Sequence, residues 1–151
     1  MPPRVTTARD PRVVRAARLL RDEEARREEG AFVVDGADLL REAVARGIEV
    51  EWVIGDGGVP ASPDALRALA AVGQPPSVVA VCRIPEAPPA DLPPRSLVLS
   101  GVTGAGNVGS IVRTAAAFGV PRVALTPDCA DPWSRPALRA AMGATFARGL
   151  V

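Results

Sequence analysis

The chain of 151 residues contains no histidine, no lysine and no tyrosine. Without histidine it lacks the side chain that most often serves as a general base or a metal ligand near neutral pH. Serine–histidine and cysteine–histidine nucleophile systems and histidine-containing zinc sites are therefore excluded. All 18 basic residues are arginine, and an arginine side chain stays protonated in proteins.

Cysteines and long apolar runs are also scarce. The two cysteines, Cys82 and Cys129, are far apart and in no metal-ligand spacing, which predicts two reduced thiols in a cytoplasmic protein without a metal site. No charged-then-apolar leader opens the chain, and no apolar run approaches the roughly 18 residues of a membrane span. We therefore expect no membrane partner. With two Trp and three Phe, the core has to consist of Val, Leu, Ile and Ala.

Positive charge is concentrated at the two ends of the chain. Residues 1–29 hold eight Arg against six acids, residues 30–99 five Arg against nine acids, and residues 100–151 five Arg against two acids. Arg12 and Arg15 belong to a run of arginines near the N-terminus. This run is as consistent with contacts to phosphates of a nucleic acid as with a solvated helix face, so both interpretations stay open.

A proline-rich segment divides the sequence. Five prolines in residues 85–94 are incompatible with a helix or a central strand. We predict a linker over residues 85–95 between a small α/β domain at 1–84 and a second domain at 96–151.

Hydrophobic periodicity predicts alternating helices and strands in both domains. The expected helices are one that starts at Pro11 after an Asp10 cap, then 38–46, 62–71, 107–118 and 137–142. The expected strands are 31–34, 50–54 with Trp52 in the core, 78–81, 97–99 and 123–125, with another starting at 145–146. The β-α-β order of the second domain predicts a parallel sheet.

In the helix at 107–118 one apolar stripe is expected to face the core, with Arg113 nearly opposite it. The residues of this stripe are Val108, Ile111, Val112, Ala115 and Phe118.

Three glycines at the start of this helix, Gly104, Gly106 and Gly109, spell G-x-G-x-x-G. A dinucleotide-binding loop would have this spelling between a strand and a helix, with Asp128 placed about 20 residues on to bind a ribose. A dinucleotide domain needs several further βα units, however, and only 42 residues follow Gly109. The alternative is that the glycines permit a tight strand-to-helix turn.

Residues 106–119, Gly-Asn-Val-Gly-Ser-Ile-Val-Arg-Thr-Ala-Ala-Ala-Phe-Gly, closely resemble the first motif of the SpoU/TrmH family of RNA ribose 2′-O-methyltransferases. Residues 139–144, Arg-Ala-Ala-Met-Gly-Ala, resemble the family's next conserved segment, and residues 1–84 resemble its small RNA-binding domain. The sequence departs from the family at Gly104-Ala105, often Asp-Pro, and at Ser100, often an acid.

The resemblance implies transfer of a methyl group from S-adenosylmethionine to a ribose 2′-hydroxyl of tRNA or rRNA, by a homodimer. It implies an α/β fold whose parallel-sheet catalytic domain ends in a trefoil knot. It assigns catalytic roles to Arg113, as positioner and charge stabiliser, and to Asn107, as an orienting hydrogen-bond partner. It makes Arg12, Arg15 and Arg139 candidate RNA-binding residues.

The family's second and third motifs, which form the knot and bind S-adenosylmethionine, have no counterpart in this sequence. We therefore expect a truncated methyltransferase domain without a cofactor site, unable to methylate RNA by itself. The alternative is a non-catalytic RNA-binding protein with a vestigial methyltransferase stub.

Overall fold

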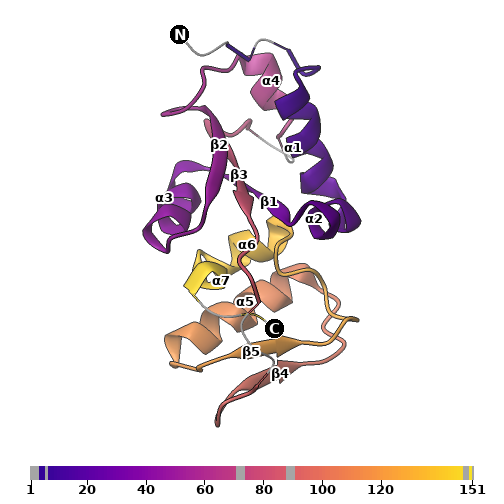
Figure 1. Cartoon of the computed structure of the whole chain (residues 1–151), viewed down its shortest axis with the longest axis vertical. Coiled ribbons are helices and arrows are strands. Elements are labelled where there is room, and N and C mark those ends of the chain that lie inside the picture. The colour runs from indigo at the N-terminus through magenta and orange to yellow at the C-terminus, as the bar shows by residue number, and fades with distance from the viewer. Residues whose placement is uncertain (1–3, 6, 71–73, 88–90, 148–149, 151) are drawn as a thin grey trace. The chain divides into compact units, whose positions relative to one another are not determined.

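The computed structural model describes residues 4–5, 7–70, 74–87, 91–147 and 150. The chain divides into two compact units, Met1–Ile84 and Pro85–Val151 (Figure 1). The division falls at the first proline of the predicted linker. Residues 85–87 and 91–95 of that linker contain no helix or strand, and residues 88–90 lie outside the described part. Among the described residues, no helix is both long and apolar enough to cross a membrane.

The first unit is a three-stranded sheet with helices. Its elements are α1 (Pro11–Arg21), α2 (Glu23–Glu29), β1 (Ala31–Asp35), α3 (Ala37–Ala45), β2 (Val50–Gly55), α4 (Pro63–Arg67) and β3 (Val78–Arg83). The strand order is β1-β3-β2, and β3 runs antiparallel to both neighbours. The three predicted strands are confirmed. The helix predicted over 62–71 ends already at Arg67, and Ala71 lies outside the described residues.

The start of α1 follows from two residues. The Asp10 carboxylate accepts a hydrogen bond from the backbone N–H of Arg12 at 2.9 Å, which satisfies one of the unpaired donors of the first turn. Pro11 occupies the first helical position, where its missing N–H costs nothing. The buried residues Val13, Ala16 and Leu19 then recur along one face.

The core of the first unit forms because β1 and β3 are buried on both faces of the sheet. Val33 lies opposite Val81 in the register, and this face of the sheet joins the buried residues of α1 in one cluster. Phe32 and Cys82, which also pair in the register, point to the other face and are fully buried, because side chains alternate along a strand. Trp52 packs partly buried against the first cluster, which confirms its prediction as a core residue.

Helix α2 was not predicted from the sequence. The Asp22 carboxylate caps it by accepting from the N–H groups of Glu24 and Ala25, and Gly30 closes it with φ +59°. Its seven residues include one apolar side chain, Ala25. Hydrophobic periodicity therefore gave no signal, although the cap and the terminal glycine were both present in the sequence.

The second unit begins with a parallel β-α-β unit. Its elements are β4 (Leu97–Leu99), α5 (Ala105–Ala117), β5 (Val123–Leu125), α6 (Arg135–Ala141) and α7 (Ala144–Ala147). Strands β4 and β5 pair in parallel, with Leu97 opposite Val123 and Leu99 opposite Leu125. The predicted parallel pairing is confirmed.

The strand expected to start at Thr145-Phe146 is wrong, because these residues lie in α7 and are buried there. Helix α7 follows α6 directly, after a turn in which Met142 and Gly143 have positive φ. Leu150, a few residues later, forms an isolated parallel bridge with Val123.

The apolar stripe of α5 is confirmed except at its end. Val108, Val112 and Ala115 are buried, together with Leu99 and Val123 of the two strands. Phe118, predicted to belong to this stripe, is 84% exposed. At 100° per residue it lies about 80° around the helix from Val108, beyond the face that the short sheet covers.

Candidate functional site

The carboxyl ends of β4 and β5 are joined by one carboxylate. Asp128, two residues after the loop begins at Thr126, accepts hydrogen bonds from the Thr126 hydroxyl and from the backbone N–H of Gly101 at 3.3 Å. These hydrogen bonds, that of the Thr126 hydroxyl first, lower the pKa of Asp128 below its ordinary value. The Asp128 carboxylate therefore links the segments that follow the C-terminal ends of β4 and β5.

The three glycines of the G-x-G-x-x-G spelling do not form a phosphate-binding turn in the described structure. None of Gly104, Gly106 and Gly109 has a positive φ, whereas Gly101, which precedes them, has φ +65°. Gly104 is the N-cap of α5, and the other two lie inside the helix. The left-handed turn after β4 is thus made by Gly101, and the G-x-G-x-x-G residues form the start of α5.

Gly109 has a specific reason to be a glycine. A Cβ at this position would lie 2.2 Å from the carbonyl oxygen of Ala137 and 2.8 Å from the Cβ of Ala140. Helices α5 and α6 therefore approach each other closely at this point, with the backbone of one against small residues of the other. This crossing brings the C-terminal end of α6 toward the polar face of α5.

The polar face of α5 begins at Asn107. Its side chain forms no described hydrogen bond, and its Nδ2 lies next to Gly104, where a Cβ would be 3.1 Å from it. The hydroxyl of Ser110 donates to the backbone carbonyl of Asn107 at 3.0 Å, and the hydroxyl of Thr114 donates to that of Ser110 at 2.9 Å. The two hydroxyls are thus occupied within the helix, while the Asn107 amide is exposed and available.

Arg113 is exposed on the side of α5 away from the core stripe, as the sequence predicted, about 120° around the helix from Asn107. Its Nη1 donates to the Sδ atom of Met142 at 3.3 Å, and no ion pair links it to a carboxylate among the described residues. Met142 follows α6 with φ +50°. The structure thus brings together one predicted site residue, Arg113, and a residue that the sequence did not single out.

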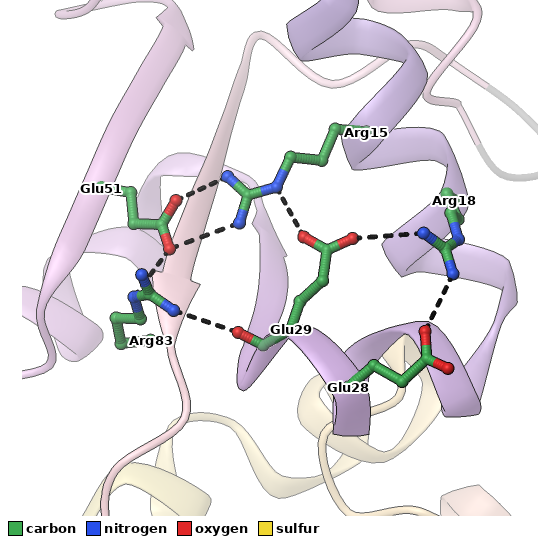
Figure 2. Close-up of polar contacts among 6 residues, drawn as sticks. All are labelled: Arg15, Arg18, Glu28, Glu29, Glu51 and Arg83. Atoms are coloured by element: carbon green, nitrogen blue, oxygen red, sulfur yellow. Dashed lines mark hydrogen bonds and ion pairs between the residues drawn. The ribbon is translucent and has the colours of Figure 1, made fainter.

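The N-terminal arginine run is placed differently. Arg15 on α1 contacts Glu29 of α2 with an Nε–Oε2 distance of 2.6 Å and Glu51 of β2 with an Nη1–Oε2 distance of 2.5 Å (Figure 2). Arg83 of β3 also binds Glu51, with an Nε–Oε1 distance of 2.8 Å. Arg18 pairs with Glu28 at 3.1 Å. We call these six residues of four elements the N-terminal ion network.

The ion network neutralises the arginines that belong to it. The hydrogen bonds from Arg15 lower the pKa of Glu51, and the two carboxylates in turn raise the pKa of Arg15. Arg12, another predicted RNA-binding residue, pairs with Asp10 at 2.9 Å. Arg139 is exposed on α6. The charges of Arg12 and Arg15 are thus matched by carboxylates within the fold, which an external phosphate would have to displace.

Three comparisons place this geometry among known proteins. Residues 94–150 match the SpoU rRNA Methylase family. A tRNA/rRNA methyltransferase of Synechocystis, itself uncharacterized, is 30% identical over 164 residues, which cover 94% of this chain and 59% of that relative. The 23S rRNA (guanosine(2553)-2′-O)-methyltransferase RlmP of Bacillus subtilis is 31% identical over 134 residues, which cover 80% of this chain and 54% of RlmP.

A solved structure agrees with these sequence matches. The SpoU methyltransferase AviRb of Streptomyces viridochromogenes, in complex with S-adenosylmethionine, superposes with a TM-score of 0.83 and 27% identity. The similarity covers 95% of this chain and 63% of AviRb. The chain therefore spans between 54 and 63% of the length of these three relatives.

Proposed function

Because this chain belongs to the SpoU family of RNA methyltransferases, we propose that it acts in the transfer of a methyl group from S-adenosylmethionine to a ribose 2′-hydroxyl of rRNA or tRNA. RlmP is by its name a 2′-O-methyltransferase of 23S rRNA, which supports the ribose as target. The observation in this chain that carries the proposal is the exposed Arg113 guanidinium, which has no carboxylate partner in the described structure.

Arg113 differs from Arg12 and Arg15 in the group that it contacts. Arg12 and Arg15 are matched by carboxylates, so their charge is satisfied inside the protein. Arg113 contacts a neutral sulfur atom instead, and its charge remains available to an anion. A guanidinium presents its donors in a planar fork that fits a phosphate.

The chemistry of the reaction requires such a group. A ribose 2′-hydroxyl is a poor nucleophile, and its attack is helped by a group that offsets the charge that develops on the oxygen. A guanidinium offers hydrogen-bond donors and no acceptor, so in this proposal Arg113 holds the RNA phosphate and stabilises charge rather than removing the proton. The side-chain amide of Asn107, which forms no hydrogen bond with the described residues, lies at the start of the same helix and orients the ribose by hydrogen bonding.

We assign no residue of this chain to S-adenosylmethionine. A hollow in the described part of the second unit is lined by Leu97, Ser110, Ile111, Thr114, Ala115, Phe118 and Val120. Its two hydroxyls already donate to the carbonyls of their own helix, and the hollow offers no charged group. It does not fit the ribose hydroxyls and the charged methionine group of that cofactor. When bound, the cofactor supplies the methyl group.

Two features of the family resemblance complete the proposal. The first unit serves as the RNA-binding domain, and Arg139 on α6 is a candidate contact. Arg12 and Arg15 could contact an RNA phosphate only by giving up their carboxylate partners. The active protein is a cytoplasmic homodimer. No cluster of three or more potential metal ligands occurs in the described part of the chain, and the proposed chemistry assigns no role to a metal.

The proposal is tested by RNA binding at several salt concentrations. For single-stranded RNA each phosphate contact contributes about −0.7 to the slope of log K against log salt concentration. We expect Arg113→Gln to weaken binding of a short oligouridylate and to reduce the magnitude of the slope by about 0.7. Arg41→Gln, which removes an exposed arginine that pairs with Asp38, is the charge-matched control. An unchanged slope in Arg113→Gln would remove Arg113 from phosphate binding.

Methyl transfer is then measured on the protein as its gene encodes it, with radiolabelled S-adenosylmethionine and ribosomal RNA. A product that resists alkaline hydrolysis at the labelled nucleotide identifies a 2′-O-methyl group and supports the proposal. Methylation of a base contradicts it. Binding of RNA without any transfer favours the alternative, a non-catalytic RNA-binding protein.

A further inference from the structure

We propose that Met142 is the positioning residue of Arg113: its thioether holds the guanidinium on the polar face of α5 without neutralising its charge. This inference rests on the proposed function, in which Arg113 receives an RNA phosphate. Its starting point is the 3.3 Å contact between Nη1 of Arg113 and Sδ of Met142. Arg113 lies in α5 and Met142 caps the C-terminal end of α6, 29 positions apart in the sequence.

The backbone conformation at position 142 does not explain why a methionine is found there. Met142 ends α6 in the left-handed conformation, with φ +50° and ψ +44°, and its N–H donates to the carbonyl of Leu138. Glycine is the residue that usually adopts this conformation at a helix end, because a Cβ is strained there. The side chain of Met142 is also 68% exposed, so it contributes little to the core. Its described polar contact is Arg113.

A thioether suits the task of holding a cation that must stay available. Sulfur in methionine is a weak, neutral acceptor, so it can orient the guanidinium without an opposing charge. A carboxylate would pair with the guanidinium, as Glu51 pairs with Arg15 in the first unit. The chain thus contains both arrangements: an arginine fixed and neutralised in the N-terminal ion network, and an arginine fixed but still charged on α5.

The close crossing at Gly109 makes the contact geometrically possible. Arg113 lies one helical turn after Gly109 on α5, and Met142 follows the α6 residues Ala137 and Ala140 that pack against Gly109. With larger side chains at the crossing, α6 would lie farther from α5. The thioether could then no longer reach the guanidinium.

The contact itself is tested by nuclear magnetic resonance. The chain has two methionines, Met1 and Met142, so a methyl-13C methionine label gives two resonances, and Met142→Leu identifies the second. We expect Arg113→Gln to shift the Met142 methyl resonance, whereas Arg41→Gln leaves it in place. A Met142 resonance that is the same with and without Arg113 would overturn the proposal.

Three variants at position 142 then test the function of the contact with the same oligouridylate. Met142→Leu keeps the shape but removes the acceptor, and we expect binding about threefold weaker, since a single hydrogen bond contributes modestly. The salt slope should stay as in the parent, because the charge of Arg113 remains. Met142→Gln, which restores a neutral acceptor, should recover affinity. Met142→Glu should lower both affinity and the magnitude of the slope, by about 0.7, because it pairs with Arg113.

Failure of this inference differs from failure of the proposed function. If Arg113→Gln binds RNA with reduced slope but Met142→Leu binds like the parent, Met142 does not position Arg113. If Arg113→Gln itself binds like the parent, the proposed role of Arg113 fails, and the functional role of Met142 fails with it. The shift of the Met142 methyl resonance reports on the contact in either case.

Discussion

Gly109 of α5 lies directly against the carbonyl oxygen of Ala137 in α6, so closely that a Cβ on Gly109 would stand 2.2 Å from that oxygen. The crossing of α5 and α6 therefore depends on the absence of a side chain at one position. Since Arg113 and Met142 lie beyond this crossing, the packing of two helices controls the geometry of the candidate site.

Gly109→Ala should move α6 away from α5. We expect the free energy of unfolding to fall by about 1–3 kcal/mol, the usual cost of an extra methyl group in a packed site. Urea denaturation measures this loss, and the Met142 methyl resonance should shift because Arg113 loses its contact. Gly106→Ala is the matched control. No atom lies within 4 Å of a Cβ at position 106, so alanine should stabilise α5 by up to about 1 kcal/mol. Equal stability of the two variants would contradict this account of Gly109.

Glu51→Gln should weaken the N-terminal ion network. The side chain of Glu51 is 16% exposed and binds both Arg15 and Arg83. We expect a loss of about 1 kcal/mol, at the upper end for a partly exposed ion pair, measured by urea denaturation. Asp38→Asn removes a fully surface-exposed pair with Arg41 and should change the stability by much less. A Glu51→Gln variant as stable as the parent would show that the network is not stabilising.

The same network predicts a dependence on pH. The pKa of Glu51 is lowered in the folded protein from its ordinary value of 4.5, first by hydrogen bonding to Arg15. A group with a lowered folded pKa stabilises the protein above its unfolded pKa, and this contribution is lost as the pH falls through the folded pKa. The unfolding free energy should therefore decline below about pH 4.5. The decline should be shallower in Glu51→Gln, and parallel curves for the two proteins would exclude Glu51 as its source.

Arg15 and Arg113 should differ in RNA binding. Since Arg15 is held by two carboxylates, Arg15→Gln should reduce stability while leaving the salt slope of oligouridylate binding unchanged. Arg113→Gln should reduce the slope without reducing stability. Denaturation and fluorescence anisotropy on the same two variants check both halves. A reduced slope in Arg15→Gln, with the fold intact, would instead support a contact between Arg15 and RNA.

The buried thiol of Cys82 should react far more slowly in the native protein than in the unfolded protein. Burial, and then the charge of Glu51, raise the pKa of Cys82 to about 12, and the thiolate is the reactive form. At pH 8 the native Cys82 should react with a thiol reagent about a thousandfold more slowly than after unfolding in urea. Cys129→Ser leaves Cys82 as the only thiol for this measurement. Fast reaction of that variant in the native state would contradict the described burial.

Local signals predicted the elements well where they were strong. Asp10 and Pro11 fixed the start of α1, and the runs at 31–34, 78–81 and 97–99 became strands. Helix α2 was not predicted because only one of its seven residues, Ala25, is apolar, although Asp22 and Gly30 mark its two ends. The strand expected at 145–146 failed because two buried residues in a row have no period that separates a strand from a helix.

The candidate site was predicted in part. A motif containing Asn107 and Arg113 is visible in the printed sequence, and both residues lie exposed on one helix as expected. The partners of the arginines were not predictable, because Arg15 meets Glu51 across 36 positions and Arg113 meets Met142 across 29. Only the folded chain decides which charges meet.

The sequence by itself determined the β-α-β order, the helix that carries Arg113 and the family to which the chain belongs, since each depends on residues close together in the chain. Tertiary structure decided which arginines keep an available charge. It placed Arg15 among carboxylates and Arg113 beside a neutral sulfur atom, through packing between elements distant in sequence. The physical reason is that the sequence shows only that a side chain is charged. Whether that charge is available to a ligand depends on which groups lie next to it in the folded protein.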